Sequence, residues 1–112
     1  MAGLAREFRI RERKDYLRIQ ASAERHYSRH FILLRAELSP AFVRAGKARL
    51  GITASKKIGN AVARNRVKRR VRVFFRSVRG QLAANDYVVI ARKGAAELLS
   101  FETDGELRSL LR

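Results

Sequence analysis

Residues 60–80, NAVARNRVKRRVRVFFRSVRG, combine a continuous apolar stripe with a continuous basic stripe. On a helical wheel the apolar side comprises Ala63, Val67, Val71, Phe74, Phe75 and Val78. The opposite side comprises Asn65, Lys68, Arg69, Arg72, Arg76 and Arg79. We expect Asn60 to cap this helix and Gly80 to stop it after Arg79. The segment therefore predicts a helix of roughly 30 Å that lies on a sheet and shows its basic side to solvent.

Three segments around this helix have the composition of strands, namely residues 28–38, 49–54 and 86–92, with a loop expected at 40–47. In the first strand one face carries Ile32, Leu34, Ala36 and Leu38, and the other carries Phe31, Leu33, Arg35 and Glu37. The third strand contains the continuous apolar run Tyr87-Val88-Val89-Ile90, which indicates burial on both faces or a central place in the sheet.

Two shorter helices are expected near the ends of the chain, over residues 14–23 and 100–112. We expect Ser100 to cap the second of these helices, and Leu107, Leu110 and Leu111 to form its inward face. Gly105 lies inside it and costs about 1 kcal/mol relative to Ala. Together, these elements predict one α+β domain over residues 1–112.

The charge of the chain is strongly positive and unevenly distributed. Among 112 residues, 26 Lys and Arg oppose 10 Asp and Glu, a formal net charge of +16. No acidic residue lies between Glu37 and Asp86, an interval that carries 13 of the basic residues. Such a block is typical of a surface that binds a polyanion, with nucleic acid the first candidate and an anionic membrane surface the second.

Several functional classes are disfavoured by what the chain does not contain. It has no cysteine, which excludes disulfides and thiolate metal sites and fits a cytoplasmic protein. It has no apolar run long enough to span a membrane, and its first 14 residues do not resemble a secretory signal. The basic centre lacks the clustered carboxylates of a two-metal nuclease. His26 and His30 have no third ligand beside them, so we expect no metal site. Since no catalytic constellation is visible in the sequence, we also expect no catalytic residues in the protein.

The turn into the long helix is the clearest candidate anion site. Lys56 and Lys57 precede Gly59 and Asn60, where the free N–H groups of a helix N-terminus favour negative charge. The first turns then carry Arg64, Asn65, Arg66, Lys68, Arg69 and Arg70. Guanidinium groups bind phosphate in bidentate fashion, and an amide such as that of Asn65 can contact a base edge or a 2′-hydroxyl. This pattern predicts an RNA-binding helix; the alternative is a basic face that is only solvated, which the one-signed block of charge disfavours.

Residues 55–70, SKKIGNAVARNRVKRR, resemble the signature of the bacterial ribonuclease P protein subunit. In that family Ser-Lys-Lys-x-Gly-Asn-Ala-Val leads into Arg-Asn-Arg-x-Lys-Arg. The resemblance continues through residues 9–19, which include Asp15-Tyr16, and through 29–33, 86–92 and 106–111. It implies an α-β-β-α-β-α order, about four strands and a left-handed β-α-β crossover, an α-β sandwich like domain 2 of ribosomal protein S5.

The resemblance also implies two binding surfaces. The long helix would contact a catalytic RNA, and a cleft between the first helix and the sheet would hold the single-stranded 5′ leader of precursor tRNA. Candidate RNA-binding residues are Lys56, Lys57, Asn60, Arg64, Asn65, Arg66, Lys68, Arg69, Arg70 and Arg72. Candidate leader-cleft residues are Phe8, Arg9, Tyr16 and Phe31. Gln20 and Leu34 stand where other members often carry aromatic residues, and for Tyr16 and Phe31 plain core packing is the alternative.

The expected activity is that of a subunit of an endoribonuclease whose RNA performs catalysis. The protein itself would bind no cofactor, because Mg²⁺ would be held through the RNA subunit. The expected partners are the catalytic RNA and the precursor leader, with no DNA and no membrane. The competing interpretations are a ribosomal protein or RNA chaperone of similar shape, a DNA-binding module and a membrane-surface helix.

Overall fold

The computed structural model describes residues 8–40, 42 and 46–111. The helices are α1 (Arg13–Ser22), α2 (Ala61–Val78) and α3 (Ser100–Leu110). The strands are β1 (Glu24–Tyr27), β2 (Phe31–Glu37), β3 (Arg49–Thr53) and β4 (Asn85–Ala91). Short 3₁₀ turns cover Lys56–Ile58, Arg79–Gln81 and Ala95–Glu97. This is the predicted α+β fold, with three helices and a four-stranded sheet.

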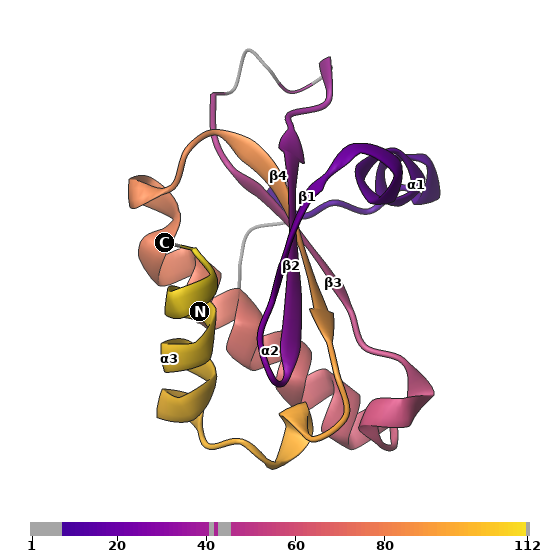
Figure 1. Cartoon of the computed structure of the whole chain (residues 1–112), viewed down its shortest axis with the longest axis vertical. Coiled ribbons are helices and arrows are strands. Elements are labelled where there is room, and N and C mark those ends of the chain that lie inside the picture. Colours follow the sequence, from indigo (N-terminus) through magenta and orange to yellow (C-terminus); the bar gives the residue numbers. More distant parts are fainter. Residues whose placement is uncertain (1–7, 41, 43–45, 112) are drawn as a thin grey trace.

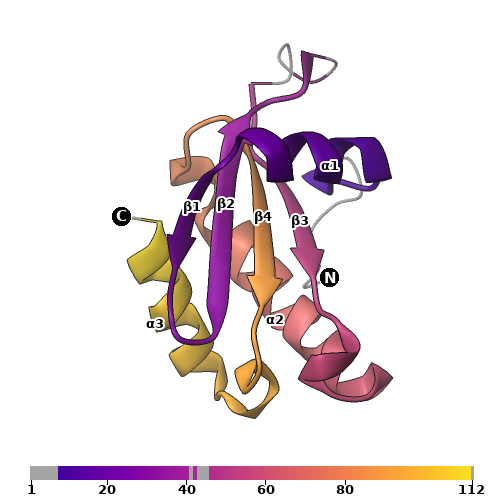
Figure 2. The same ribbon diagram turned by 45° about the vertical axis from the view of Figure 1, so that its right-hand side comes forward.

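The sheet has the order β1-β2-β4-β3, in which β3 and β4 are parallel and the other neighbours are antiparallel. In Figure 2, β3 and β4 both run downward, β4 lies to the left of β3, and α2 passes behind the sheet. This arrangement is a left-handed crossover, although nearly all β-α-β units have the opposite hand. The implied crossover is therefore confirmed, as is the central position of β4.

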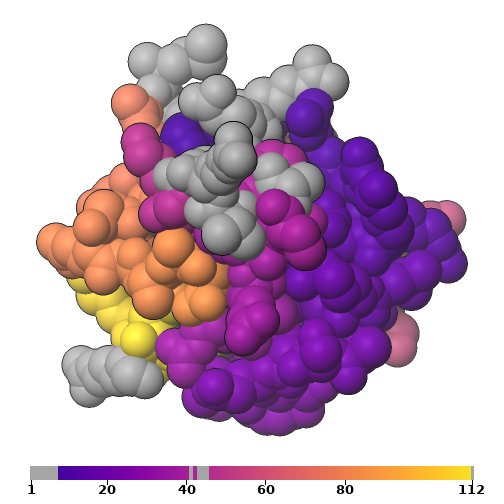
Figure 3. Space-filling view, turned by 90° about the horizontal axis from the view of Figure 1, so that it is seen from above, coloured from indigo at the N-terminus to yellow at the C-terminus, as the bar shows by residue number. Residues whose placement is uncertain are grey.

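The helices cover the sheet from two sides, with α1 on one face and α2 and α3 on the other (Figures 1 and 2). The alternation of β2 follows from this arrangement, because Phe31 and Leu33 join the main core under α2 and α3. Leu34 and Ala36 instead join a smaller core with Ile19 of α1. Seen from above, α1 and the segment after α2 lie on opposite sides of the sheet end (Figure 3).

Helix α2 forms as its sequence predicts. Its buried residues are Val67, Val71, Phe74, Phe75 and Val78, and Ala63 packs against them partly buried. The Oδ1 atom of Asn60 accepts a hydrogen bond of 2.9 Å from the Ala63 N–H, which confirms the N-cap. The helix ends at Val78 with Arg79 as its C-cap, so Gly80 stands at the expected C′ position, but it belongs to a 3₁₀ turn and lacks the left-handed φ of a C′ glycine.

Two other expected boundaries are corrected by the structure. The strand expected over residues 28–38 is β2, but it covers only Phe31–Glu37, because residues 28–30 form the turn that joins it to β1. The hydroxyl of Ser28 stabilises this turn through a hydrogen bond with the backbone of Phe31. Ser100 is the first residue of α3 instead of its cap, and Glu102 accepts a hydrogen bond of 2.8 Å from the Leu99 N–H. Leu107 and Leu110 are buried as expected.

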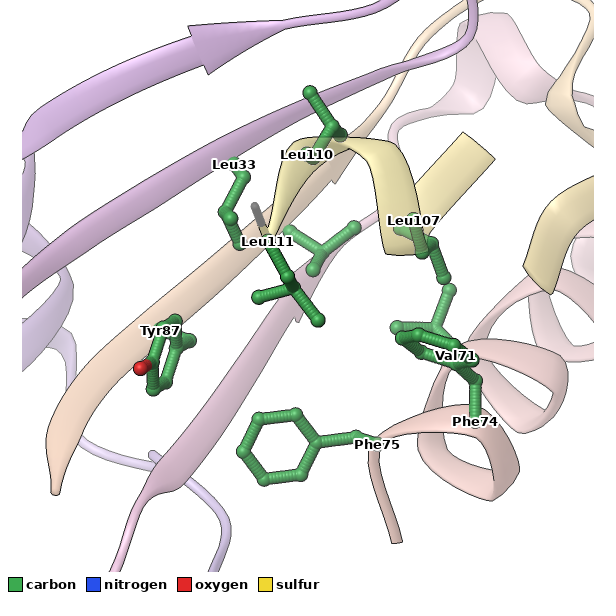
Figure 4. Close-up of a pocket in the computed structure, with 9 residues that line it drawn as sticks. Leu33, Val71, Phe74, Phe75, Tyr87, Leu107, Leu110 and Leu111 are labelled. Atoms are coloured by element: carbon green, nitrogen blue, oxygen red, sulfur yellow. The ribbon is translucent and has the colours of Figure 1, made fainter. Parts of the chain in front are cut away.

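The space beneath α3 belongs to the apolar core. Figure 4 shows side chains from β2, β4, α2 and α3 converging there, including Leu33, Phe75, Tyr87 and Leu107. The remaining cavity measures about 10 Å³, which is about the room of one water molecule. Because it is lined by apolar side chains, it is a packing gap instead of a ligand site.

Candidate nucleic-acid interface

The basic side of α2 faces solvent along the length of the helix. Among the predicted RNA-binding residues, those exposed are Lys56, Lys57, Asn60, Asn65, Arg66 and Arg69. Those partly buried are Arg64, Lys68, Arg70 and Arg72. These residues extend from the 3₁₀ turn to the fourth turn of α2, and none of them is fully buried.

The turn into α2 has the geometry that an anion site requires. Gly59 has φ of 146°, and a Cβ atom there would lie 2.9 Å from the Cβ atom of Ala63, so glycine fits where other residues would clash. The hydroxyl of Ser55 accepts a hydrogen bond of 3.3 Å from the Lys57 N–H. These contacts order the turn and direct the positive end of the α2 dipole toward the segment that carries Lys56 and Lys57.

Arg70 has a structural contact that the sequence did not reveal. Its guanidinium donates to the carbonyl oxygen of Leu98, in the loop before α3. This bond ties α2 to the loop across a groove that Arg66 also lines. Arg70 is therefore less available to a phosphate than the exposed Arg66 and Arg69 on the same helix.

A cleft of about 280 Å³ opens beside the edge strand β3. It is lined by Arg9, Ile10, Arg11, Tyr16, Leu50, Gly51, Ile52 and Arg72. These residues come from the N-terminal segment, α1, β3 and α2. The N-terminal segment is held in place by a parallel bridge between Arg9 and Leu50 and by a hydrogen bond of 2.8 Å from the Ile10 N–H to the Leu50 carbonyl. Arg72 belongs to both the cleft and the basic side of α2, so the two surfaces are continuous.

Tyr16 lies against β3 at the floor of this cleft. A Cβ atom on Gly51 would lie 2.6 Å from the Tyr16 hydroxyl, so the ring occupies space that only glycine leaves open. The hydroxyl donates a hydrogen bond of 3.1 Å to the Ile10 carbonyl. Burial raises the pKa of Tyr16, while the backbone of Ile52 and the charge of Arg72 act in the opposite direction. The phenol is therefore a neutral, half-buried group with a defined orientation.

The cleft is electrostatically suited to an anion. Burial lowers the pKa of Arg72, and the neighbouring positive charge of Arg9 lowers it further. Two guanidinium groups that repel each other in this way gain stability when a phosphate lies between them. The chemistry of the cleft is thus an aromatic and apolar floor with cationic walls.

Two of the four predicted cleft residues are placed elsewhere. Phe31 is fully buried in the main core on the opposite face of the sheet, so its prediction as a cleft residue is corrected in favour of core packing. Phe8 does not line the cleft, because its ring is covered by the guanidinium of Arg79 at 3.5 Å and the ammonium of Lys47 at 5.7 Å. Arg9 and Tyr16 do line it. Leu34 is fully buried under α1.

A buried ionic cluster next to the cleft was missed by the sequence reasoning. Asp86 is fully buried, and Arg49 forms a bidentate pair with it at 2.9 and 3.0 Å. Arg18 and Asp15 of α1 complete the cluster. The sequence did contain a signal for this cluster, because Asp86 is an acid at the start of an otherwise apolar central strand. Such an acid is expected to be buried, and a buried charge needs a partner.

Within the described part of the chain, no group of three His, Cys, Asp or Glu side chains could hold a metal ion. The Nε2 atom of His26 instead lies 3.0 Å from Oε1 of Glu24, and the Nδ1 atom of His30 lies 2.7 Å from Oε1 of Glu106. No helix among the described residues is long and apolar enough to cross a membrane.

Comparisons with known proteins agree with one another. The ribonuclease P family model matches residues 4–112. The chain is 39% identical over 98 residues to the ribonuclease P protein component of Syntrophus aciditrophicus, covering 88% of this chain and 78% of the relative. A relative of the same name from Desulforapulum autotrophicum is 39% identical over 107 residues, covering 93% and 86%.

Solved structures extend this likeness to three dimensions. The Staphylococcus aureus RNase P protein gives a TM-score of 0.84 at 32% identity, with 93% of this chain and 92% of that chain covered. The RNase P protein from Thermotoga maritima gives 0.80 at 31% identity, with 92% and 94% covered. Since sequence, fold and the basic helix point the same way, the chain belongs to the family of ribonuclease P protein components, which work with RNA in a ribonucleoprotein endoribonuclease.

Proposed function

We propose that this protein binds the RNA subunit of ribonuclease P through α2 and binds the 5′ leader of precursor tRNA in the cleft beside β3. The observation that supports this proposal best is Arg72, which belongs to both surfaces and makes them continuous. A single RNA-protein assembly could then place the leader next to the catalytic RNA. Mature tRNA lacks the leader, so the cleft would favour the precursor.

In this proposal the protein contributes positioning and charge neutralisation, and the RNA performs the cleavage. Lys68, Arg69 and Arg72 neutralise phosphates, which reduces the repulsion between two RNA molecules. The same neutralisation lowers the Mg²⁺ concentration that the RNA needs in order to hold the ions that activate the attacking water. Mg²⁺ is thus bound through the RNA, and no protein side chain takes part in bond breaking.

The decisive experiment is cleavage of precursor tRNA by a bacterial ribonuclease P RNA at low Mg²⁺, with and without this protein. Release of the leader should depend on the protein, and the protein alone should cut nothing. No stimulation with RNAs of several structural classes would reject the proposal. A ribosomal or chaperone role would then be tested by fractionation of ribosomes.

The RNA-binding surface can be tested through the salt dependence of RNA binding. Arg69→Ala should reduce the slope of log K against log salt by about 0.7–0.9 for each phosphate that the variant no longer neutralises. The matched control is Arg25→Ala, because Arg25 is exposed on β1, at the opposite edge of the sheet from β3. Equal slopes for the two variants would place the RNA-binding surface elsewhere.

A further inference from the structure

Helix α1 is attached to the sheet by few apolar contacts. Its buried residues are Asp15 and Ile19, Tyr16 packs partly buried against the same small core as Ile19, and Leu17 is half exposed. So small an apolar contact can slide or rotate against an apolar surface and keep most of its buried area, because hydrophobic attraction has no direction. The hydrogen bond from the Tyr16 hydroxyl to the Ile10 carbonyl orients the ring toward the N-terminal segment, but the position of α1 on the sheet needs another determinant.

A buried ionic cluster supplies directional contacts at this place. Arg49 of β3 donates to both carboxylate oxygens of Asp86 on β4, and Arg18 of α1 donates to the same carboxylate at 2.5 Å. Asp15 lies 3.4 Å from Arg18 and 3.5 Å from Arg49. Arg18 also donates to the Glu37 carbonyl of β2 at 3.1 Å. The cluster thus joins α1 to three strands and balances two cations with two anions.

The ionic cluster and the cleft both use side-chain positions on β3. Arg49 and Gly51 are two residues apart on β3, so their side-chain positions point to the same face of the sheet. Asp15 contacts Arg49, and the next residue, Tyr16, lies on Gly51. Consecutive residues of α1 are therefore matched to alternate residues of β3.

We propose that Asp15 is a positioning residue of the leader cleft, which acts through its ion pairs with Arg49 and Arg18, the two partners of Asp86, to hold the Tyr16 ring on Gly51. Arg49 and Arg18 make charge-assisted hydrogen bonds to Asp86, which are directional, and Asp15 forms ion pairs with both guanidinium groups, so the cluster as a whole selects one rotation and one height of α1 on the sheet. Buried ion pairs add little net stability compared with apolar side chains of similar volume, so the role of this cluster is in the arrangement of α1 that it selects. The consequence for RNA rests on the proposed function of the cleft, whereas the positioning itself is a property of the free protein.

The free protein provides the first test. Asp15→Asn keeps the shape of the side chain but leaves two cations facing one anion. The matched control is Glu12→Gln, which removes the same charge from an exposed acid just before α1 that pairs with Lys14 at 3.2 Å. Nuclear Overhauser effects between the Tyr16 ring and the Gly51 α-protons should weaken in Asp15→Asn and persist in Glu12→Gln. Unchanged effects in Asp15→Asn, and in Asp15→Ala as the stronger variant, would overturn the proposal.

Thermal unfolding separates positioning from loss of the fold. Arg49 and Arg18 keep Asp86 as a partner in Asp15→Asn, so the variant should still unfold in one cooperative transition. Nuclear Overhauser effects within the core on the other face, such as those between the Phe75 and Tyr87 rings, should be unchanged. If these core signals weaken together with those of Tyr16, the variant is generally destabilised, which would contradict a specific positioning role.

The second test uses the protein assembled with a ribonuclease P RNA. Asp15→Asn should reduce the preference for precursor over mature tRNA by about fivefold or more, the range expected when one base loses an aromatic platform. In the Tyr16→Ala background, Asp15→Asn should have no further effect, because Asp15 acts on leader binding only by positioning the Tyr16 ring. Equal losses for precursor and mature tRNA, or additive losses in the double variant, would overturn the proposal. If Tyr16→Ala leaves the preference unchanged, the leader-binding role of the cleft is rejected, and the nuclear Overhauser measurement still decides the positioning.

Discussion

Gly51→Ala tests how tightly the cleft floor is packed. The added Cβ atom would lie 2.6 Å from the Tyr16 hydroxyl oxygen, 2.8 Å from Cζ and 2.9 Å from Cε1. The ring must therefore move off the strand, which breaks its hydrogen bond to the Ile10 carbonyl. Overpacking of this kind costs about 1–3 kcal/mol. We expect Gly51→Ala to be destabilised by that amount and to lose part of its preference for precursor tRNA.

The effect of Gly51→Ala on the free energy of unfolding should have the opposite sign once the Tyr16 ring is absent. In a Tyr16→Ala background the clashing atoms are gone, and Ala is better than Gly in a strand by about 0.5–1 kcal/mol. The coupling between the two positions should therefore be about 1.5–4 kcal/mol, well above the scatter of independent sites. Urea unfolding of the wild type, both single variants and the double variant measures it, provided that the m-values agree. Effects that add to within about 0.5 kcal/mol would refute the packing argument.

Three further predictions concern stability. Gly105→Ala should stabilise the protein by about 0.5–1 kcal/mol in thermal unfolding, because a Cβ atom there meets nothing within 4 Å and α3 gains a better helix former; a destabilised variant would mean that α3 is strained at this point. Asn60→Ala should cost about 1 kcal/mol through loss of the N-cap bond to Ala63, with Asn60→Ser retaining most of the stability. Burial opposes the charge of Glu106, but hydrogen bonds from Ser28 and His30 prevail and hold its pKa below the ordinary 4.5. Its carboxylate therefore stabilises the fold above the unfolded pKa, and this contribution is lost as pH falls through the lower folded pKa. Glu106→Gln should flatten the acid limb of the stability curve, and a curve parallel to that of the wild type would exclude this role.

The sequence predicted the features that depend on neighbouring residues along the chain. The helical period of residues 60–80 specifies the apolar side of α2, and Asn60 specifies where the helix begins. The apolar run from Tyr87 predicts a strand covered on both faces, and β4 is central. The block of basic residues on α2 follows from the same periodicity, because a helix that buries one side must expose the other.

The tertiary structure decided which surfaces meet. Alternation places Phe31 and Leu34 on opposite faces of a strand, but it does not say which helix covers each face; α2 and α3 cover Phe31, and α1 covers Leu34. The charges of Asp15 and Asp86 are 71 residues apart, and only the packing of α1 on the sheet brings both to Arg49. The hand of the crossover, the space above Gly51 for the Tyr16 ring and the continuity of the cleft with α2 arise in the same way. Each depends on contacts between distant segments, and local periodicity carries no information about such contacts.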